Sequence, residues 1–262
     1  MTAGTYETIV YEKSGGVARL TLNRPEHRNG ITGRMMLEMC EALSAAGEDK
    51  SVRVLVLKGA GKDFCPGADL KHYTDGASKA GPDLNVDDFR MTTLLHQMPA
   101  VTIAAISGAC AGAGFGWACA CDLRVASRSA RFNTAFLDVA VAGDMAGPWS
   151  LPRLVGAAKA RELYFLPGKF DAAEALRIDL VSRVFDDAAF TAEVDAIVNR
   201  LADASPVALR GMKANFINAE RMDLQSYVAL ESERHLRISK SKDTQEAFRA
   251  FLEKRKPKFE SL

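Results

Sequence analysis

The chain has 262 residues, of which 48% are hydrophobic and 26% charged, with a formal net charge of +1 at pH 7. This balance is typical of a globular protein, and the small net charge argues against nucleic acid or a membrane surface as the main partner. No apolar run reaches the length of a membrane span, and the N-terminus lacks the basic and apolar segments of a signal peptide, so we expect a cytoplasmic protein. The five cysteines show no metal-ligand spacing, so we expect packed, reduced thiols and no bound metal.

The first hundred residues alternate strands and helices. A hairpin is predicted at the N-terminus, because two alternating runs flank a Gly-Gly pair. Residues 73–87 are polar and rich in glycine and proline, so we expect them to be the most mobile segment. The predicted strands cover residues 7–12, 17–22 and 52–57, and the predicted helices cover residues 33–47 and 86–98. Residues 64–70 are predicted to form a short strand that runs into a loop or the start of a helix.

The stretch from Val101 to Asp122 is the one around which the rest is organised. Residues 101–106 are an apolar run typical of a strand buried on both faces. Alternate glycines follow at Gly112, Gly114 and Gly116, and residues 115–121 read as a buried helix. The first N–H groups of a helix lack partners and lie at the positive end of its dipole, so we expect this turn to stabilise an anion. It is not a dinucleotide fingerprint, since the last glycine of GxGxxG is missing; tight helix packing is the structural alternative.

The second half of the chain becomes helical. Short strands are predicted at residues 123–126, 131–132 and 180–184, and a helix is predicted at 151–166. Asp171 is expected to cap another helix, and Ser205-Pro206 starts a further one in the favoured way. From about residue 187 the pattern is all-helical, with helices at 224–238 and 244–254.

A second turn also follows a strand and can present a free backbone N–H group. Residues 64–71, Phe-Cys-Pro-Gly-Ala-Asp-Leu-Lys, follow a strand and can present a free N–H at Ala68. Two such turns after two buried strands could converge on one carbonyl oxygen. An ordinary strand-to-helix turn is the alternative.

Several segments together resemble the enoyl-CoA hydratase/isomerase, or crotonase, superfamily. They are LNRPEHRNGI, FCPGADL, AAISGACAGAGFGWACACDLRVAS, RFNTAF, SLPRLVG and AFLEKRKPKF, in order from about residue 6 to residue 260. The resemblance implies an α/β fold, with a spiral of repeated ββα units in residues 1–200 for acyl-CoA binding and catalysis. It implies a C-terminal α-helical region in residues 201–262 for oligomerisation and coenzyme A contacts. It also implies a homotrimer or hexamer, and an acyl-CoA thioester substrate with no separate cofactor.

The resemblance assigns roles to individual residues. The N–H groups of Ala68 and Ala113 would be the two donors of an oxyanion hole. For the charged residues expected to meet coenzyme A, the alternative is that they are ordinary charged residues on the solvated surface. The positions expected to meet coenzyme A are Arg28, Pro66, Ala68, Asp69, Leu70, Lys71, Gly114, Phe251 and Lys254.

The departures from the family pattern bear on the reaction. The two glutamates of the hydratases fall at Gly116 and Phe136, and neither side chain can transfer a proton. Asp144 lies in a segment similar to that of the isomerases of the superfamily, where the aspartate is the acid/base. Its apolar neighbours would raise its pKa. A helix N-cap is the structural alternative for Asp144, and Asp138 is the reserve carboxylate.

The favoured interpretation is therefore an enoyl-CoA isomerase that stabilises a thioester enolate and shifts a double bond with Asp144. Trp117, Phe136 and Met145 would line the acyl pocket. Three alternatives stay open: a hydratase with an atypical acid/base set, nucleophilic attack by Asp144 as in aryl-CoA dehalogenases, and an acyl-CoA-binding protein without catalysis.

Overall fold

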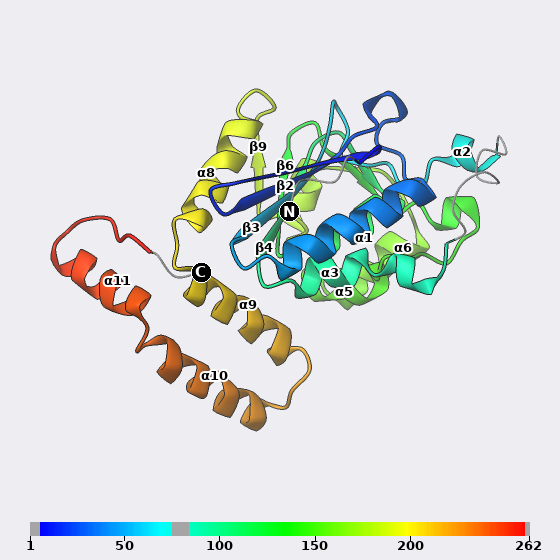
Figure 1. Cartoon of the computed structure of the whole chain (residues 1–262). Helices are drawn as coiled ribbons and strands as arrows, with labels where there is room; N and C mark the ends of the chain where they lie inside the picture. Colours follow the sequence, from blue (N-terminus) through cyan, green and yellow to red (C-terminus); the bar gives the residue numbers. More distant parts are fainter. Residues whose placement is uncertain (1–5, 75–83, 260–262) are drawn as a thin grey trace.

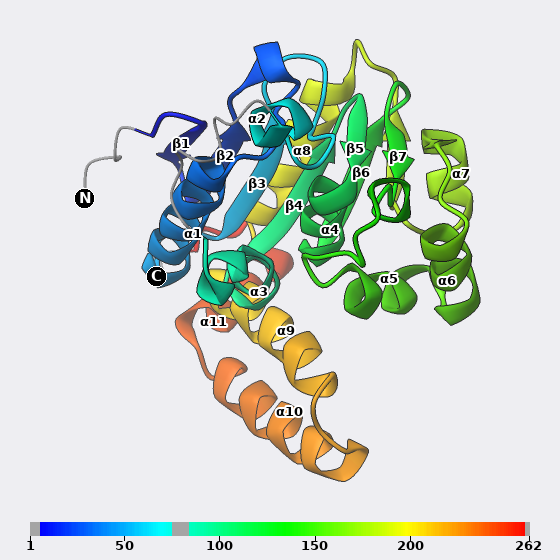
Figure 2. The same cartoon turned by 90° about the vertical axis from the view of Figure 1, so that its right-hand side faces the viewer.

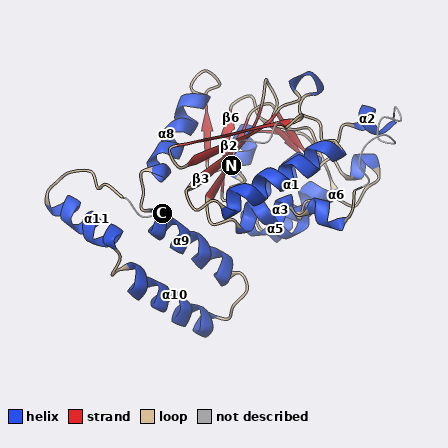
Figure 3. Ribbon diagram, in the orientation of Figure 1, coloured by secondary structure: helices blue, strands red, loops and turns tan. Residues whose placement is uncertain are grey.

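The computed structural model describes residues 6–74 and 84–259. Part of the predicted mobile segment 73–87 lies outside these ranges. Within them, a central sheet is flanked by helices, and three further helices form an arm that extends from the body (Figures 1 and 3). The helices are α1 (Gly33–Glu48), α2 (Leu70–Thr74), α3 (Met91–Gln97), α4 (Gly112–Ala120), α5 (Gly147–Val155), α6 (Ala157–Phe165), α7 (Ala172–Arg177), α8 (Phe190–Ala202), α9 (Pro206–Ala219), α10 (Leu224–Ile238) and α11 (Lys242–Leu252), with short 3₁₀ turns η1 (Pro25–His27), η3 (Val86–Phe89) and η4 (Leu137–Val139).

The described strands form two sheets. The large sheet contains β1 (Ile9–Ser14), β2 (Val17–Leu22), β3 (Val54–Gly59), β4 (Val101–Ile106), β6 (Leu123–Ser127) and β9 (Arg183–Phe185), in that spatial order. Only β1 and β2 are antiparallel, and the predicted Gly15-Gly16 turn joins them with positive φ at both glycines, as a tight hairpin requires. The small sheet contains β5 (Ala109–Ala111), β7 (Arg131–Asn133) and β8 (Phe170–Asp171).

The chain repeats a ββα pattern, which confirms the predicted fold class. β4, β5 and α4 form one unit, and β6, β7 and α5 form the next. The first strand of each unit enters the large sheet, and the second enters the small sheet. The α4 helix consequently lies beside both sheets (Figure 2).

The central strands are buried on both faces, as their continuous apolar runs predict. In β3, Leu55 and Leu57 face the core that contains α1 and α4, whereas Val54 and Val56 face the core under α8. This alternation is the two-residue period of a strand. It places α4 inside the molecule, and every residue of that helix is buried.

Several boundaries differ from the sequence prediction. The helix α4 begins at Gly112 rather than residue 115, because residues 109–111 form β5 and lead directly into it. The predicted helix 151–166 is divided into α5 and α6 at Gly156, whose φ is +80°. The short strand expected after residue 64 is replaced by isolated bridges, such as Cys65 with Cys110, whereas the expected helix start is present at Leu70, where α2 begins. The last short strand, β9, begins at Arg183, later than expected.

The C-terminal helices match their predicted ranges closely, and the Ser205 side chain caps α9 by accepting from the Ala208 N–H. The arm is anchored to the body by Lys213 of α9, whose buried ammonium bonds Asp122 at the end of α4. The other Asp122 oxygen accepts from the backbone N–H of Thr102 at 2.8 Å. One buried ion pair thus joins the arm to both β4 and α4.

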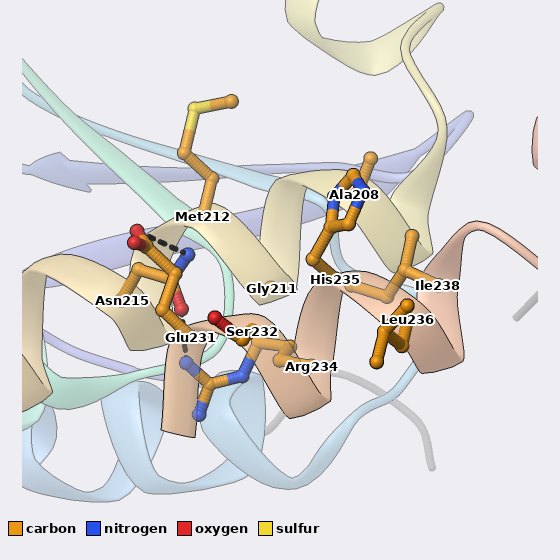
Figure 4. A pocket seen from close by; sticks show the side chains of 10 residues that line it. All are labelled: Ala208, Gly211, Met212, Asn215, Glu231, Ser232, Arg234, His235, Leu236 and Ile238. Carbon is orange, nitrogen blue, oxygen red and sulfur yellow. Dashed lines mark hydrogen bonds between the residues drawn. The ribbon is translucent and has the colours of Figure 1, made fainter. Parts of the chain in front are cut away.

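The arm exposes several large apolar side chains and carries a groove. No residue of α10 is buried, and Phe216, Phe248 and Phe251 are 65–84% exposed. A groove of about 600 Å³ lies between α9 and α10, where Asn215 bonds Glu231 (Figure 4). Among the described residues, no helix is long and apolar enough to cross a membrane.

Candidate active site

The N-terminus of α4 has no side chain to cap it. Its N-cap, Ala111, has an extended backbone, and Gly112 has a positive φ of 52°, which glycine adopts without steric cost. The sequence Ala-Gly-Ala-Gly offers no side-chain acceptor. The first N–H groups of the helix, including that of Ala113, therefore have no intrahelical partner.

The chain around residue 67 runs directly beside this helix start. The Cys65 N–H donates to the Ala109 carbonyl at 2.8 Å, and the Ala111 N–H donates to the Cys65 carbonyl at 2.9 Å. Gly67 and Gly112 then face each other, because a Cβ on either would lie 3.5 Å from the Cα of the other. Ala68 and Ala113 are the residues that immediately follow this contact.

Ala68 forms an isolated parallel bridge with Ile31, and this bridge does not use the Ala68 N–H. The neighbouring groups make the bridge, since the Ile31 N–H donates to the Gly67 carbonyl and the Asp69 N–H donates to the Ile31 carbonyl. In a parallel bridge the central residue points its N–H away from the partner. No acceptor for the Ala68 N–H is found in residues 6–74 or 84–259. The two predicted donors thus come from adjacent segments, and one of them is free.

Two residues that the sequence analysis did not single out hold this segment in place. Arg24 pairs with the Asp69 carboxylate at 2.9 Å, with both side chains largely buried. Asn29 is fully buried, accepts from the Arg24 N–H, and donates to the carbonyls of Ala60 and Asp63. Both belong to the LNRPEHRNGI motif, so the resemblance carried a signal for them.

The predicted coenzyme A positions lie in different environments. Arg28 pairs with the Asp63 carboxylate at 2.8 Å, and this hydrogen bond is the main reason that the pKa of Asp63 is lowered. The Asp69 N–H is already paired with Ile31. Gly114 is buried against Cys65, since a Cβ there would lie 2.6 Å from the Cys65 Cβ.

The other coenzyme A positions remain accessible to a ligand. Leu70, Lys71, Phe251 and Lys254 are exposed, and Pro66 is half-buried beside Gly112. Whether these residues meet coenzyme A stays a prediction.

Asp144 lies in the loop between η4 and α5 and is half-buried. Its Oδ1 is buried and has no hydrogen-bond partner among the described residues. Burial removes water from the carboxylate, and this desolvation raises the pKa of Asp144. The capping alternative is wrong, because the N-cap of α5 is Ala146 and no side chain caps that helix. The reserve carboxylate, Asp138, lies exposed in η4.

The two positions that hold glutamates in hydratases are closely packed. A Cβ at Gly116 would lie 2.6 Å from the Met145 Cβ and 3.1 Å from the Met145 carbonyl oxygen. Phe136 is 7% exposed and stacks on Tyr164, with ring centroids 6.0 Å apart. The first of these contacts also places residue 145, and hence the Asp144 loop, against the first turn of α4.

The predicted acyl-pocket residues have little free surface. Trp117 is fully buried in the main core, and Met145 is 4% exposed. The Trp117 Nε1 has no hydrogen-bond partner within the described parts of the chain. The assignment of these side chains to an acyl pocket stays a prediction.

Tyr164 of α6 is a site residue that sequence reasoning missed. Its hydroxyl is buried without a hydrogen-bond partner in the described ranges. Desolvation, Cys119 and Asp144 together raise its pKa, so the phenol stays protonated. In the sequence it is one aromatic residue in an ordinary amphipathic helix, and no motif marks it. Within the same ranges, no cluster of three or more histidine, cysteine or acidic side chains could hold a metal.

Comparisons with known proteins agree with this fold. A family model described as enoyl-CoA hydratase/isomerase matches residues 12–262. A 1,2-epoxyphenylacetyl-CoA isomerase of Escherichia coli (strain K12) is 33% identical over 257 residues, covering 97% of this chain and 98% of that protein. A crotonyl-CoA hydratase of Syntrophomonas wolfei is 30% identical over 255 residues, with the same two coverages. The crystal structure of an enoyl-CoA hydratase from Bacillus anthracis matches with a TM-score of 0.86 at 30% identity, covering 97% of this chain and 99% of that chain.

Proposed function

Because the chain belongs to the enoyl-CoA hydratase/isomerase family, we propose that it moves the double bond of an enoyl-CoA from the 3-position to the 2-position. Asp144 takes the proton from C2, and the electrons of the broken C–H bond pass into a dienolate. The same carboxyl group returns the proton to C4, so the C3=C4 double bond becomes C2=C3. Atoms and charge balance without water or a redox partner.

The oxyanion hole in this proposal consists of the Ala68 and Ala113 N–H groups. Its support is the close approach of Gly67 to Gly112, because Ala68 and Ala113 are the residues that follow these two glycines on adjoining segments. The dipole of α4 adds positive potential where the dienolate oxygen forms. Removing one such donor in other enzymes costs about 10²- to 10³-fold in rate, so two preorganised donors supply a large part of the catalysis.

The state of Asp144 is the observation that carries the isomerase assignment. A carboxylate with a raised pKa and one buried oxygen that finds no partner among the described residues is suited to take up and return a proton. An exposed aspartate would be too weak a base and would exchange its proton with water. Asp138 in the same loop is such an exposed carboxylate.

Water addition by the usual glutamate pair is disfavoured on steric grounds. Gly116 has no room even for a methyl group beside Met145. Met145 therefore packs where the side chain of the first glutamate would begin. Phe136 fills the second position with a stacked ring. A glutamate at residue 116 would therefore require Met145 to move, and at residue 136 a stacked ring stands in place of a carboxylate.

We also propose that the protein assembles as a homotrimer, alone or paired into a hexamer, through its C-terminal arm. The support is the exposed apolar surface of α9, α10 and α11, where Leu224, Leu252 and Phe251 are 77–84% exposed. A soluble monomer rarely leaves such a surface uncovered. Phe251 and Lys254 lie at the end of this arm and would meet coenzyme A, with Lys71 and the loop around Ala68 binding its adenine end.

The Asp144→Asn variant tests the function. The amide cannot take up a proton, so isomerisation of 3-hexenoyl-CoA should fall by about 10²- to 10⁴-fold, measured by the absorbance of the conjugated product. The control is Asp138→Asn, which removes an exposed carboxylate from the same loop and should leave the rate within about twofold. Equal rates for Asp144→Asn and the wild type would refute the assignment, as would formation of a 3-hydroxyacyl-CoA as the main product.

A further inference from the structure

The hydroxyl of Tyr164 is held at the start of α5, close to the Asp144 loop. A Cβ at Gly147 would collide with this hydroxyl oxygen, and a Cβ at Gly143 would lie 3.5 Å from both the Tyr164 ring and the Phe136 ring. Tyr164 and Phe136 are stacked with an interplanar angle of 14°. The ring therefore has a fixed orientation. Its hydroxyl lies beside Gly147, which follows Asp144 by three residues in the chain.

The two groups are chemically complementary, and neither has a hydrogen-bond partner among the described residues. The phenol can donate a hydrogen bond, and the carboxylate Oδ1 can accept one. Each atom is buried, and neither finds a hydrogen-bond partner in the described residues. The Asp144 charge contributes to the raised pKa of Tyr164, so the two are near enough to interact electrostatically. A buried donor and a buried acceptor that stay unpaired each carry a desolvation cost.

The loop that carries Asp144 has an unusual backbone. Ala140, Met145 and Ala146 all have positive φ angles, between 51° and 58°, and Gly143 has φ +104°. Left-handed backbone is unfavourable for residues with a Cβ, so this loop is under local strain. By contrast, Tyr164 lies on a regular helix and is fixed by its stacking. Closing the gap requires a movement of the Asp144 side chain or loop, not of the tyrosine.

We infer that Tyr164 is a positioning residue whose hydroxyl donates to Oδ1 of Asp144 when acyl-CoA is bound, leaving Oδ2 to exchange the proton with the substrate carbons. Hydrogen bonds of catalytic groups are often long in ligand-free enzymes and tighten in the substrate complex. The bond fixes which carboxylate oxygen faces the substrate. It also favours the ionised form of Asp144, which burial disfavours.

Other ionisable groups near the pair are Tyr73 and Cys119. Tyr73 of α2 is 41% exposed, and its pKa is raised by burial, Asp69 and Asp144. Cys119 of α4 is buried with its pKa raised to about 12 by desolvation, so it stays neutral. Tyr164 differs from Tyr73 because its hydroxyl is buried and finds no acceptor within the described residues.

The inference rests on the proposed function for the role of Asp144, and it is tested with Tyr164→Phe, which keeps the ring and its stacking. Without the donor, the carboxylate needs a higher pH to ionise. The acid limb of the pH profile of kcat/KM for 3-hexenoyl-CoA should move upward by about one pH unit. At neutral pH, kcat should fall by about tenfold, while KM stays within about twofold. Tyr73→Phe is the matched control and should keep the acid limb of the wild type.

A second measurement does not depend on turnover. The pKa of Asp144, followed by carbon NMR with the unreactive thioester butyryl-CoA bound, should be higher in Tyr164→Phe than in the wild type. An unchanged acid limb and an unchanged Asp144 pKa in Tyr164→Phe would overturn the inference, as would equal shifts in Tyr73→Phe. If Asp144→Asn were fully active, the proposed function would fail instead.

Discussion

Asp144 combines two requirements that normally conflict at one residue. A proton carrier needs a pKa high enough to hold a proton, and burial provides this by removing water from the carboxylate. The same burial makes the ionised form costly in the folded protein. Under the proposed function, the fold gives up stability at this position to obtain a reactive group, as active sites often do.

The effect of Asp144 on the free energy of unfolding should depend on pH. The pKa of Asp144 is higher in the folded than in the unfolded chain. At a pH where the carboxyl is protonated in both states, this difference does not lower the free energy of unfolding. As the pH rises through the folded pKa, the unfolded state has already released its proton and the folded state loses stability. Asp144→Asn should therefore raise the free energy of unfolding at pH 7, and the gain should shrink towards pH 4. Denaturant unfolding of both proteins at several pH values measures this difference.

The exposed Asp138 provides the comparison for that measurement. Asp138→Asn removes a solvated carboxylate and should change stability by less than about 0.5 kcal/mol at either pH. A loss of stability in Asp144→Asn at pH 7 would mean that the carboxylate has stabilising partners.

At the scale of elements, the position of α4 depends on close packing at its glycines. Gly114 lies against Cys65 and Gly116 lies against Met145, at distances that leave no room for a Cβ. These contacts hold the helix start beside the loop of Ala68 and bring the Asp144 loop onto the first turn. The glycines thus serve the geometry of the site through their lack of a side chain.

Gly116→Ala should test this packing. The added Cβ would lie 2.6 Å from the Met145 Cβ, and such overpacking costs about 1–3 kcal/mol, which outweighs the gain in helix propensity of up to about 1 kcal/mol. We expect a net loss of stability in urea unfolding and a lower isomerase rate. Gly168→Ala is the control, because a Cβ at Gly168 meets nothing within 4 Å. A stability of Gly116→Ala equal to or above the wild type would contradict the role given to this contact.

The sequence predicted most elements but not how they meet. The double-sided burial of β3 and β4 and the caps at Asp171 and Ser205 were readable from local patterns, and the structure confirms them. The start of α4 was misplaced because the alternate glycines at 112–116 read as a turn, so the helix was expected to begin only near the end of that run. Tyr164 was missed because its significance depends on contacts with residues 136 and 147, which no local pattern encodes.

At the scale of the whole molecule, a buried ion pair joins the arm to the body, alongside contacts such as that of His96 in α3 with Glu220 at the end of α9. Lys213 and Asp122 connect α9 to the far end of α4, the helix whose start forms the candidate site. The rest of the arm presents apolar side chains outward. An arm of this kind is stable when other copies of the chain cover it, and the proposed assembly would provide that cover.

Sedimentation equilibrium measures the assembly directly. The chain has a mass of 28.3 kDa, and we expect a particle of about three or six times that mass at micromolar concentration. Charges placed at Phe216 and Leu236 of the arm, in Phe216→Asp with Leu236→Asp, should shift the protein towards monomer. Val86→Asp, at an exposed apolar residue of the body, should keep the assembled mass. A monomeric wild type would contradict the proposal.

The account depends most on Asp144 carrying a proton between two carbons beside the amides of Ala68 and Ala113. The most direct measurement is the isomerisation of 3-hexenoyl-CoA in deuterium oxide, compared between the wild type and Asp144→Asn. We predict that the wild type forms 2-hexenoyl-CoA with part of the C2 hydrogen retained at C4, because the shielded carboxyl returns it, and that Asp144→Asn forms almost none. Product formation by Asp144→Asn at the rate of the wild type would contradict the account.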